Sequence, residues 1–391
     1  MEENDNYDKN EVAGVRVVLS GYYGFDNVGD EAILYAIIHS LREYHPRIEI
    51  IVLSHKPEKT AETYRVKAIS RWSLKEVRAA IKSSDGLISG GGSLLQDETG
   101  RKSIPYYAGV MKIAQQLKKP VFVYAQGMGP INSKLNQMIV KHVLNSVKLL
   151  TVRDEQSKQL LEKIGVTSGI HLVPDPVMGL EAGNFQSSWL RQQEFRNKVI
   201  SVSVRDWINE EYTFREIAQG LDELVNKGVE IVFVPMHGKH DFKTSQRVQG
   251  LMKTKAHIAP YDSTIQEKMA IIKESDVLFG MRLHALIFAA VSDTPFVALS
   301  YDPKIDSFAD IVSQPVLGHV EAEDWNHVDL VQTIERIFAN YPDELEKITQ
   351  AATPLQKNAN ETARAVIDSI EASTASAAPL AYTAKAKAKN R

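Results

Sequence analysis

Short apolar runs alternate with amphipathic segments along most of this chain of 391 residues. The amphipathic segments repeat their apolar residues at the spacing of an α-helix, as at residues 30–44. Strands separated by helices form βαβ units, and their strands lie parallel in one sheet. The pattern therefore predicts an α/β protein. The apolar runs expected to be strands in the first half lie at residues 15–19, 48–53, 86–89, 121–125 and 149–152.

The alternation stops at a polar interval, residues 185–197, and starts again at residue 199. A chain of this length exceeds the usual size of one hydrophobic core. We therefore expect two Rossmann-like domains, at residues 12–183 and 198–345, facing each other across a cleft. This arrangement resembles the GT-B fold, in which ligands bind beyond the carboxyl ends of the strands.

The end of the chain has a different composition. Residues 346–372 have a helical pattern and are predicted to form a C-terminal helix that packs back across the domains. Residues 374–391 are rich in Ala, Ser and Lys, and their small apolar surface predicts disorder. We interpret these residues as a solvated tail, with weak contact to an anionic membrane surface as the alternative.

Composition excludes several classes of site and partner. The absence of cysteine removes disulfides, thiolate nucleophiles and cysteine-based metal sites. A net charge of −3 gives no general affinity for polyanions, so no nucleic-acid partner is expected. The acidic, polar start has neither the basic residues nor the apolar run of a signal peptide, which predicts a cytoplasmic protein.

Glycine-rich turns follow three predicted strands of the first domain. GYYGFDNVGDEA, at residues 21–32, lacks the signature of a phosphate loop, and its acids favour a sugar-hydroxyl site or a capped turn. SGGGSLLQD, at residues 89–97, allows a ligand to approach the backbone. AQGMGP, at residues 125–130, is interpreted as a structural turn that lines the cleft. The predicted substrate-binding residues in the first two turns are Asp26, Asn27, Asp30, Gly91, Gly92 and Asp97.

Cations follow the next strand ends. Arg153, in TVRDE, is either a surface residue paired with a neighbouring acid or an anion-binding fork. Arg282 and His284, in GMRLHA, lie where a buried strand turns into a helix, which predicts an anion pocket with a group able to exchange protons. Lys304 follows a later strand and is a candidate second cation of that pocket.

A loop at residues 235–241 contains two histidines and an aspartate, His237, His240 and Asp241. This set would suggest a metal, but the histidines are three residues apart on a predicted loop without an evident supporting shell. We therefore predict no metal site.

Together these five motifs resemble the polysaccharide pyruvyl transferase family, and in particular its bacterial CsaB-type members. The resemblance runs from about residue 14 to 345 and rests on the combination of motifs. It implies phosphoenolpyruvate as the donor, with Arg153, Arg282 and His284 acting on it, and no cofactor. It further implies a lipid-linked saccharide acceptor at the cytoplasmic membrane face, such as β-ManNAc of a secondary cell-wall polysaccharide that anchors S-layer proteins.

The resemblance agrees with the chemistry of the motifs. Two arginines can bind the phosphate and carboxylate of this donor, with Lys304 stabilising the leaving phosphate. His284 is the candidate general acid or base, and Asp26, Asp30 or Asp97 could be a carboxylate base for the sugar. Replacing Arg282 or His284 by alanine is predicted to abolish transfer in a folded protein.

Two other functions fit the same fold. A nucleotide-sugar glycosyltransferase would use the cations of the second domain on a diphosphate and an acid on the ribose, for which Glu321 and Glu323 are candidates. A sugar- or phosphate-binding protein would use Arg282 and His284 for affinity alone.

Overall fold

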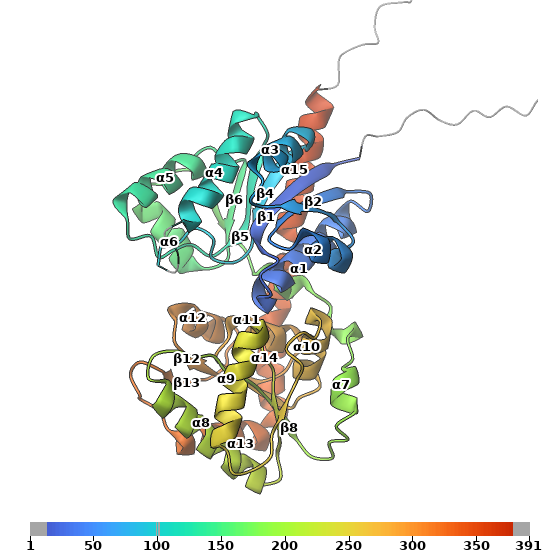
Figure 1. Cartoon of the computed structure of the whole chain (residues 1–391). Helices are drawn as coiled ribbons and strands as arrows, with labels where there is room; N and C mark the ends of the chain where they lie inside the picture. Colours follow the sequence, from blue (N-terminus) through green and yellow to red (C-terminus); the bar gives the residue numbers. More distant parts are fainter. Residues whose placement is uncertain (1–13, 99, 101, 378–391) are drawn as a thin grey trace, which may run out of the picture.

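The computed structural model describes residues 14–98, 100 and 102–377, and it contains two α/β units, each built on a parallel sheet (Figure 1). The two sheets agree with the predicted pair of domains. Residues 12 and 13 of the predicted first domain lie outside the described residues, and so do residues 378–391 of the predicted tail.

The N-terminal unit has a seven-stranded sheet of order β3-β2-β1-β4-β5-β6-β7. The order reverses between β1 and β4, and such a switch point is where ligands bind in open α/β sheets. Its strands are β1 (Arg16–Tyr23), β2 (Glu49–Ser54), β3 (Lys67–Ser70), β4 (Gly86–Gly90), β5 (Val121–Gln126), β6 (Leu149–Val152) and β7 (Ile170–Leu172). Its helices are α1 (Val28–Tyr44), α2 (Pro57–Tyr64), α3 (Leu74–Ser83), α4 (Ser103–Gln116), α5 (Lys134–Leu144) and α6 (Glu155–Lys163).

The C-terminal unit repeats this plan with six strands in the order β10-β9-β8-β11-β12-β13. Its strands are β8 (Val199–Ser203), β9 (Glu230–Phe233), β10 (His257–Ile258), β11 (Val277–Gly280), β12 (Phe296–Ser300) and β13 (Val316–His319). Its helices are α8 (Glu210–Asn226), α9 (Gly238–Leu251), α10 (Ile265–Lys273), α11 (Leu283–Val291), α12 (Pro303–Ile311) and α13 (His327–Ala339). The connection between the units contains the 3₁₀ helices η1 (Pro176–Gly179) and η2 (Ala182–Asn184) and the short helix α7 (Ser188–Arg191).

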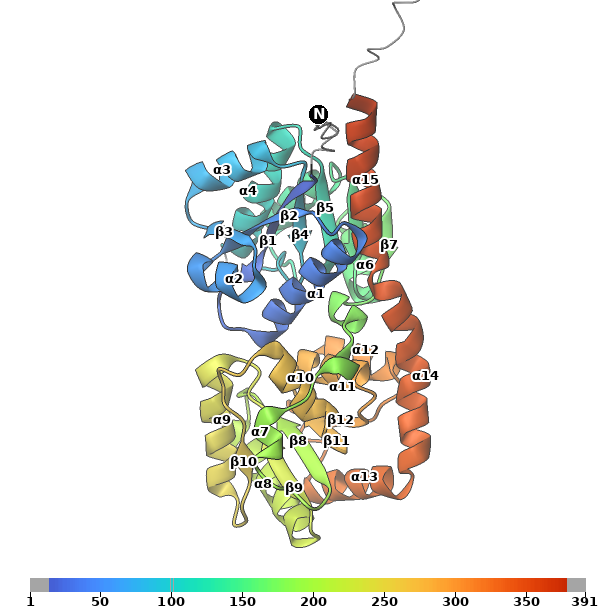
Figure 2. The same ribbon diagram turned by 90° about the vertical axis from the view of Figure 1, so that its right-hand side faces the viewer.

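The chain then returns to the N-terminal unit (Figure 2). The single predicted C-terminal helix is in fact two helices, α14 (Tyr341–Ala359), which packs on α11 and η1, and α15 (Glu361–Ala377), which packs on α1 and β5. Between them Asn360 accepts a hydrogen bond from Ser40 Oγ of α1 at 2.6 Å. The apolar face of α15, with Val366 and Ile370 buried, thus completes the N-terminal unit, which the predicted domain boundaries did not include.

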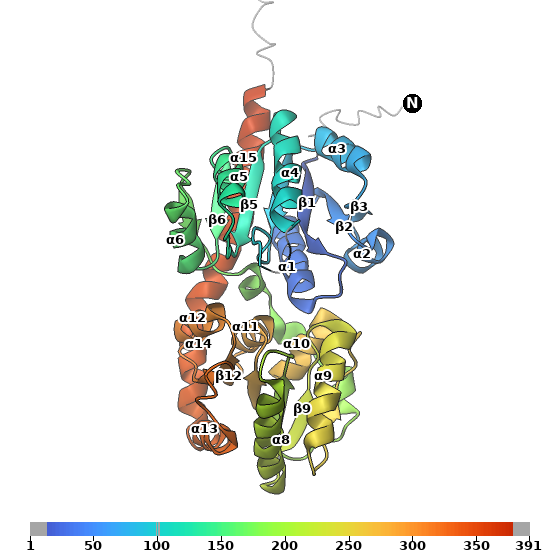
Figure 3. The ribbon, with the colours of Figure 1, turned by 60° about the vertical axis from the view of Figure 1, so that its left-hand side comes forward.

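Apolar packing joins the two units. Residues of α1, η1, α11, α14 and α15 belong to one continuous hydrophobic core. Helix α11 is apolar on every side, and eight of its residues are buried, as expected for a helix surrounded by protein. Figure 3 shows the N-terminal end of α1 reaching the C-terminal unit beside α10 and α11. Among the described residues, no helix is both long and apolar enough to span a membrane.

One segment differs from its predicted structure. Residues 235–241, expected to be a loop, lead into α9, which begins at Gly238. The polar sequence of this helix hides a buried face of Asp241, Thr244, Ser245 and Val248, so apolar periodicity could not reveal it.

Candidate active site

The first glycine-rich turn connects the two units. Asn27, a predicted ligand, is the N-cap of α1, where its side chain accepts a hydrogen bond from Gly29 N at 3.1 Å. The next residue, Val28, donates its backbone N–H to the Met236 carbonyl of the C-terminal unit at 3.0 Å. The start of α1 is therefore held against the opposite unit, and Asp30 lies in its first turn.

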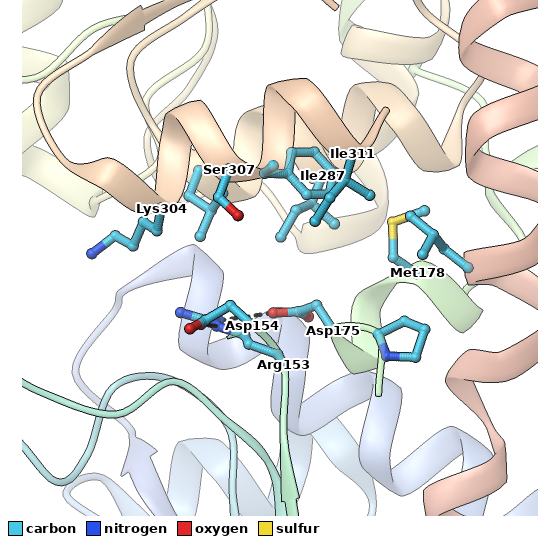
Figure 4. Close-up of a pocket in the computed structure, with 12 residues that line it drawn as sticks. Arg153, Asp154, Asp175, Met178, Ile287, Lys304, Ser307 and Ile311 are labelled. Atoms are coloured by element: carbon cyan, nitrogen blue, oxygen red, sulfur yellow. Dashed lines mark hydrogen bonds and ion pairs between the residues drawn. The ribbon is translucent and has the colours of Figure 1, made fainter. Parts of the chain in front are cut away.

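Three of the predicted cations and proton-exchanging groups come together across the cleft, as Figure 4 shows for Arg153 and Lys304. Nη1 of Arg153 donates to Oδ2 of Asp175 at 2.8 Å, and both side chains are buried. The Nε2 atom of His284 lies 3.8 Å from the same carboxylate oxygen. Lys304, in the first turn of α12, pairs with Asp302 at 2.7 Å and keeps a third of its side chain exposed.

Burial controls the charge of His284. Its pKa is lowered to about 4, chiefly by desolvation; the charge of Asp175 opposes this shift, and the positive charges of Arg153 and Lys304 add to it. The ring lies against Gly29, where an added Cβ would overlap Nδ1. The imidazole is therefore neutral at physiological pH, and its buried Nε2 makes no hydrogen bond within the described chain.

Asp30 has the opposite shift. Burial raises its pKa to about 7, although the nearby Arg153 opposes the rise. Its carboxylate packs against the backbone of Gly92, where an added Cβ would overlap Oδ1. No hydrogen bond to this carboxylate occurs within the described part of the chain. The site thus combines Asp30, which is partly protonated near pH 7, with His284, which is neutral at that pH. A protonated acid beside a neutral base is typical of acid–base catalysis.

A cavity of about 60 Å³ lies beside this cluster (Figure 4). Arg153, Asp175 and Lys304 form its polar end, while Ile287 and Phe308 belong to its apolar wall. It has room for a small anion or a few water molecules.

Arg282 does not join this cluster, although it was predicted to share a pocket with His284 and Lys304. Its guanidinium binds the carboxylate of Asp241 in a two-pronged pair, through Nε at 2.9 Å and through Nη2. The Asp241 side chain is completely buried, so the pair fixes the start of α9 against the N-cap of α11. In the structure Arg282 pairs with Asp241 and not with a residue of the cluster, and its role in catalysis stays a prediction.

Of the remaining predicted ligands, some lie beside the cluster and others bind partners elsewhere. Gly91 and Gly92 adopt φ angles of 75° and 64°, a left-handed conformation that glycine favours, in the turn beside Asp30, and their contact with substrate stays a prediction. Asp26 instead pairs with Lys56 and Lys59. Asp97 accepts hydrogen bonds from the backbone of Asn132 and Ser133 and from the Asn136 side chain, so its carboxylate orders the loop before α5 away from the cluster.

The residues considered as possible metal ligands, His237, His240 and Asp241, have other surroundings in the structure. His240 contacts Asp206 at 2.7 Å, and Asp241 is held by Arg282. Burial, followed by the charge of Arg282, lowers the pKa of His237. Within residues 14–98, 100 and 102–377, no group of three or more His, Asp or Glu side chains is placed to hold a metal ion.

An aromatic surface lies on the N-terminal unit near Asp30. The Phe25 ring stacks between Tyr22 and His55, with ring centroids 4.0 and 4.5 Å away. Arg71 is only 4% exposed and lies under the rings of Phe25 and Trp72. We call Tyr22, Phe25, His55, Arg71 and Trp72 the aromatic platform. Trp72 is 60% exposed and Tyr22 is 38% exposed, so the platform presents aromatic rings at the surface.

Sequence comparison decides the family. The family model of polysaccharide pyruvyl transferase matches residues 27–303, which contain all the clustered residues except Lys304. The chain belongs to this family. The pyruvyl transferase is also 20% identical to the amylovoran biosynthesis protein AmsJ of Erwinia amylovora, over 91% of this chain and 100% of AmsJ. Family membership supports a transferase that moves pyruvyl groups in polysaccharide synthesis, whereas the CsaB-type assignment stays a prediction.

Solved structures confirm the GT-B-like fold of the pyruvyl transferase. HepE of Anabaena in complex with UDP-glucose aligns with a TM-score of 0.63 at 12% identity, over 92% of this chain and 99% of HepE. A glycosyltransferase of Rickettsia africae aligns with a TM-score of 0.64 at 14% identity, over 92% of this chain and 98% of the glycosyltransferase. The UDP-GlcNAc 2-epimerase of Neisseria meningitidis aligns with a TM-score of 0.62 at 13% identity, over 92% of this chain and 100% of the epimerase. At such identities the likeness concerns the fold alone.

Sequence reasoning missed two parts of the pyruvyl transferase site. Asp175 lies between two prolines after the short strand β7, outside every motif, and only the folded chain brings it to Arg153 and His284. The aromatic platform draws on three separated segments, and the aromatic pair in residues 21–32 was its one local signal.

Proposed function

We propose that this pyruvyl transferase moves the pyruvyl group of phosphoenolpyruvate onto two hydroxyls of a sugar, forming a ketal and releasing phosphate. The observation that carries the proposal is the cluster itself. Two cations, Arg153 and Lys304, lie beside a neutral His284 and an Asp30 whose pKa is about 7. No metal or cofactor is part of the proposal.

The cations suit a small donor with two anionic groups. Arg153 is oriented by Asp175, and its planar guanidinium can bind a carboxylate or phosphate through two parallel hydrogen bonds. Lys304 lies across the cavity on α12 and can neutralise charge on the departing phosphate. Arg282 keeps the loop between β11 and α11 in place, and we retain direct contact with the donor only as a prediction.

The pKa values favour one division of the proton transfers. Asp30, in its protonated form, donates a proton to the methylene carbon of the enol, which becomes a methyl group and leaves a cationic centre at C2. A sugar hydroxyl attacks C2 and gives its proton to the neutral His284. A second hydroxyl then displaces the phosphate, which leaves with that hydroxyl's proton. The open choice between acid and base for His284 is thus resolved as base in this proposal.

We assign the acceptor to the aromatic platform, because sugar rings pack their apolar faces on exposed aromatic side chains. Tyr22 belongs to the platform and is close enough to Asp30 for its pKa to be raised by that charge, after the larger effect of burial. We keep β-ManNAc of a lipid-linked secondary cell-wall polysaccharide precursor as the proposed acceptor, at the cytoplasmic face of the membrane and in the service of S-layer anchoring. The resemblance supports this choice.

Thermal unfolding with ligands tests the donor first. Phosphoenolpyruvate is expected to raise the midpoint of the wild-type protein and to leave Arg153→Ala unchanged, since a ligand that binds only the native state stabilises it. Phosphate release with N-acetylmannosaminides, together with a new methyl signal by NMR, then tests transfer. Stabilisation by UDP-sugars alone would replace this proposal with the nucleotide-sugar glycosyltransferase.

A further inference from the structure

A second, much larger cavity lies between the two units. Its volume is about 800 Å³, and it is bounded by α1 and α2 on one side and by the starts of α9 and α10 on the other. Val28, Glu31 and Tyr35 line it, and their spacing places them on one face of α1. Asp30 faces Gly92 on another side of the same helix. We call this cavity the interdomain pocket; nothing in the catalytic cluster accounts for it.

The walls of the interdomain pocket combine aromatic rings with uncharged polar groups. Phe25, Tyr35 and Tyr261 contribute rings from both units. Thr63 and Gln266 add side chains that make no hydrogen bond elsewhere among the described residues. Aromatic faces with many hydrogen-bonding groups around them are suited to a flat, hydroxyl-rich ligand.

The charges of the interdomain pocket disfavour an anionic ligand. Lys59 is paired with Asp26, and His240 is paired with Asp206. Glu31 is a further acid on the wall, where its carboxylate accepts hydrogen bonds from Tyr64 and the backbone of Gly24. Lys239 faces the Tyr261 ring at 5.6 Å, and Asp262 lies beside that ring in sequence. A polyphosphate would therefore meet about as many acids as free cations.

The interdomain pocket adjoins the proposed acceptor surface at one shared residue. Phe25 belongs to both, since its ring stacks on Tyr22 of the aromatic platform and also lines the pocket. An acceptor ring on the platform beside Asp30 would thus have its neighbouring sugars directed past Phe25 into the pocket.

We propose that the interdomain pocket binds the sugar units adjoining the one that receives the pyruvyl group, so that the acceptor is an uncharged oligosaccharide segment rather than a single sugar. This inference rests on the proposed function for the identity of the reaction, but the binding of the segment can be measured without turnover.

The probes are methyl glycosides of one, two and three β-linked N-acetylhexosamine units. Two variants change the pocket: Tyr261→Ala removes a wall, and Thr63→Trp fills space from the exposed surface of α2. Tyr44→Ala is the matched control, because Tyr44 is an exposed tyrosine at the end of α1 that does not line the pocket.

Binding is measured by calorimetry, and transfer by phosphate release from phosphoenolpyruvate. The wild type is expected to bind the trisaccharide at least about tenfold more tightly than the monosaccharide. Both pocket variants should lose that preference and keep the KM for phosphoenolpyruvate, and Tyr44→Ala should keep both.

Equal affinity of the wild type for one and three units, or an unchanged preference in both pocket variants, would overturn the inference. Binding of UDP-glucose in place of the trisaccharide, weakened by Tyr261→Ala, would make the pocket a nucleotide site and overturn it too. Trisaccharide preference without any phosphate release would support the pocket and refute the proposed function, so the two failures are distinguishable.

Discussion

Removing the Arg282 guanidinium should destabilise the pyruvyl transferase severely. The partner of Arg282, Asp241, is completely buried. Apart from Arg282, the one hydrogen-bond donor to the Asp241 carboxylate in the described chain is the Met236 backbone N–H, at 3.2 Å. Arg282→Ala would leave a buried carboxylate without its cation, which typically costs about 3–5 kcal/mol. This revises the expectation that the alanine variant stays folded, and a loss of activity in it would not identify a catalytic group.

Urea unfolding followed by circular dichroism measures the effect on the free energy of unfolding. Arg247→Ala is the control, because Arg247 forms the same two-pronged pair with Glu210 at the surface, where about 0.2–1 kcal/mol is expected. Asp241→Asn in the Arg282→Ala background should recover most of the loss, since a neutral amide then replaces the unpaired buried carboxylate. A loss below about 1 kcal/mol in Arg282→Ala would refute the reasoning.

Four further predictions concern the cluster and the aromatic platform. The rate at low donor concentration should fall above pH about 7, as Asp30 loses its proton, and below pH about 4, as His284 gains one, which a pH profile of kcat/KM would check. Because the folded-state pKa of Asp30 is raised, its contribution to stability is lost as pH rises from about 4 to about 7; Asp30→Asn should therefore raise the melting temperature at pH 8 more than at pH 4, and an equal change at both would count against the raised pKa. Gly29→Ala should displace the His284 ring and lower kcat by at least about tenfold, whereas unchanged kinetics would show that the contact does not orient the ring. Trp72→Ala should raise the acceptor KM about tenfold and leave the donor KM unchanged, because the exposed indole adds nothing to the core; a donor effect of equal size would contradict the platform assignment.

Strands and buried helices were predictable because their signals are local. The expected strands at residues 149–152 and 277–280 coincide with β6 and β11, since continuous apolar runs between polar turns have few other structures. Helix α9 was missed because its buried face is largely polar. The short strands β3 and β7 were missed because they lie at the two edges of the sheet, where exposed positions give no apolar run.

The candidate site was predictable to the extent that strand ends fix position. Arg153, His284 and Lys304 follow strands whose carboxyl ends meet at the cleft, so their meeting follows from topology. The direction in which each side chain points from the start of α11 could not be predicted in the same way. Arg282 and His284 are two residues apart, yet one faces Asp241 on α9 and the other faces Asp175, which depends on acids that no motif contains.

The return of α15 makes the N-terminal unit discontinuous in sequence. The whole C-terminal unit is an insertion between β7 and α15, and α1 and β5 lack their cover until the last helix arrives. During synthesis the usual order of folding, first domain first, is therefore reversed at the final step. The inserted C-terminal unit can fold while the ribosome still holds α15. The sheet of the N-terminal unit is synthesised first but is the last to be completely covered. Nascent chains arrested with α15 still inside the ribosomal exit tunnel should accordingly yield a protease-resistant C-terminal unit and a susceptible N-terminal one.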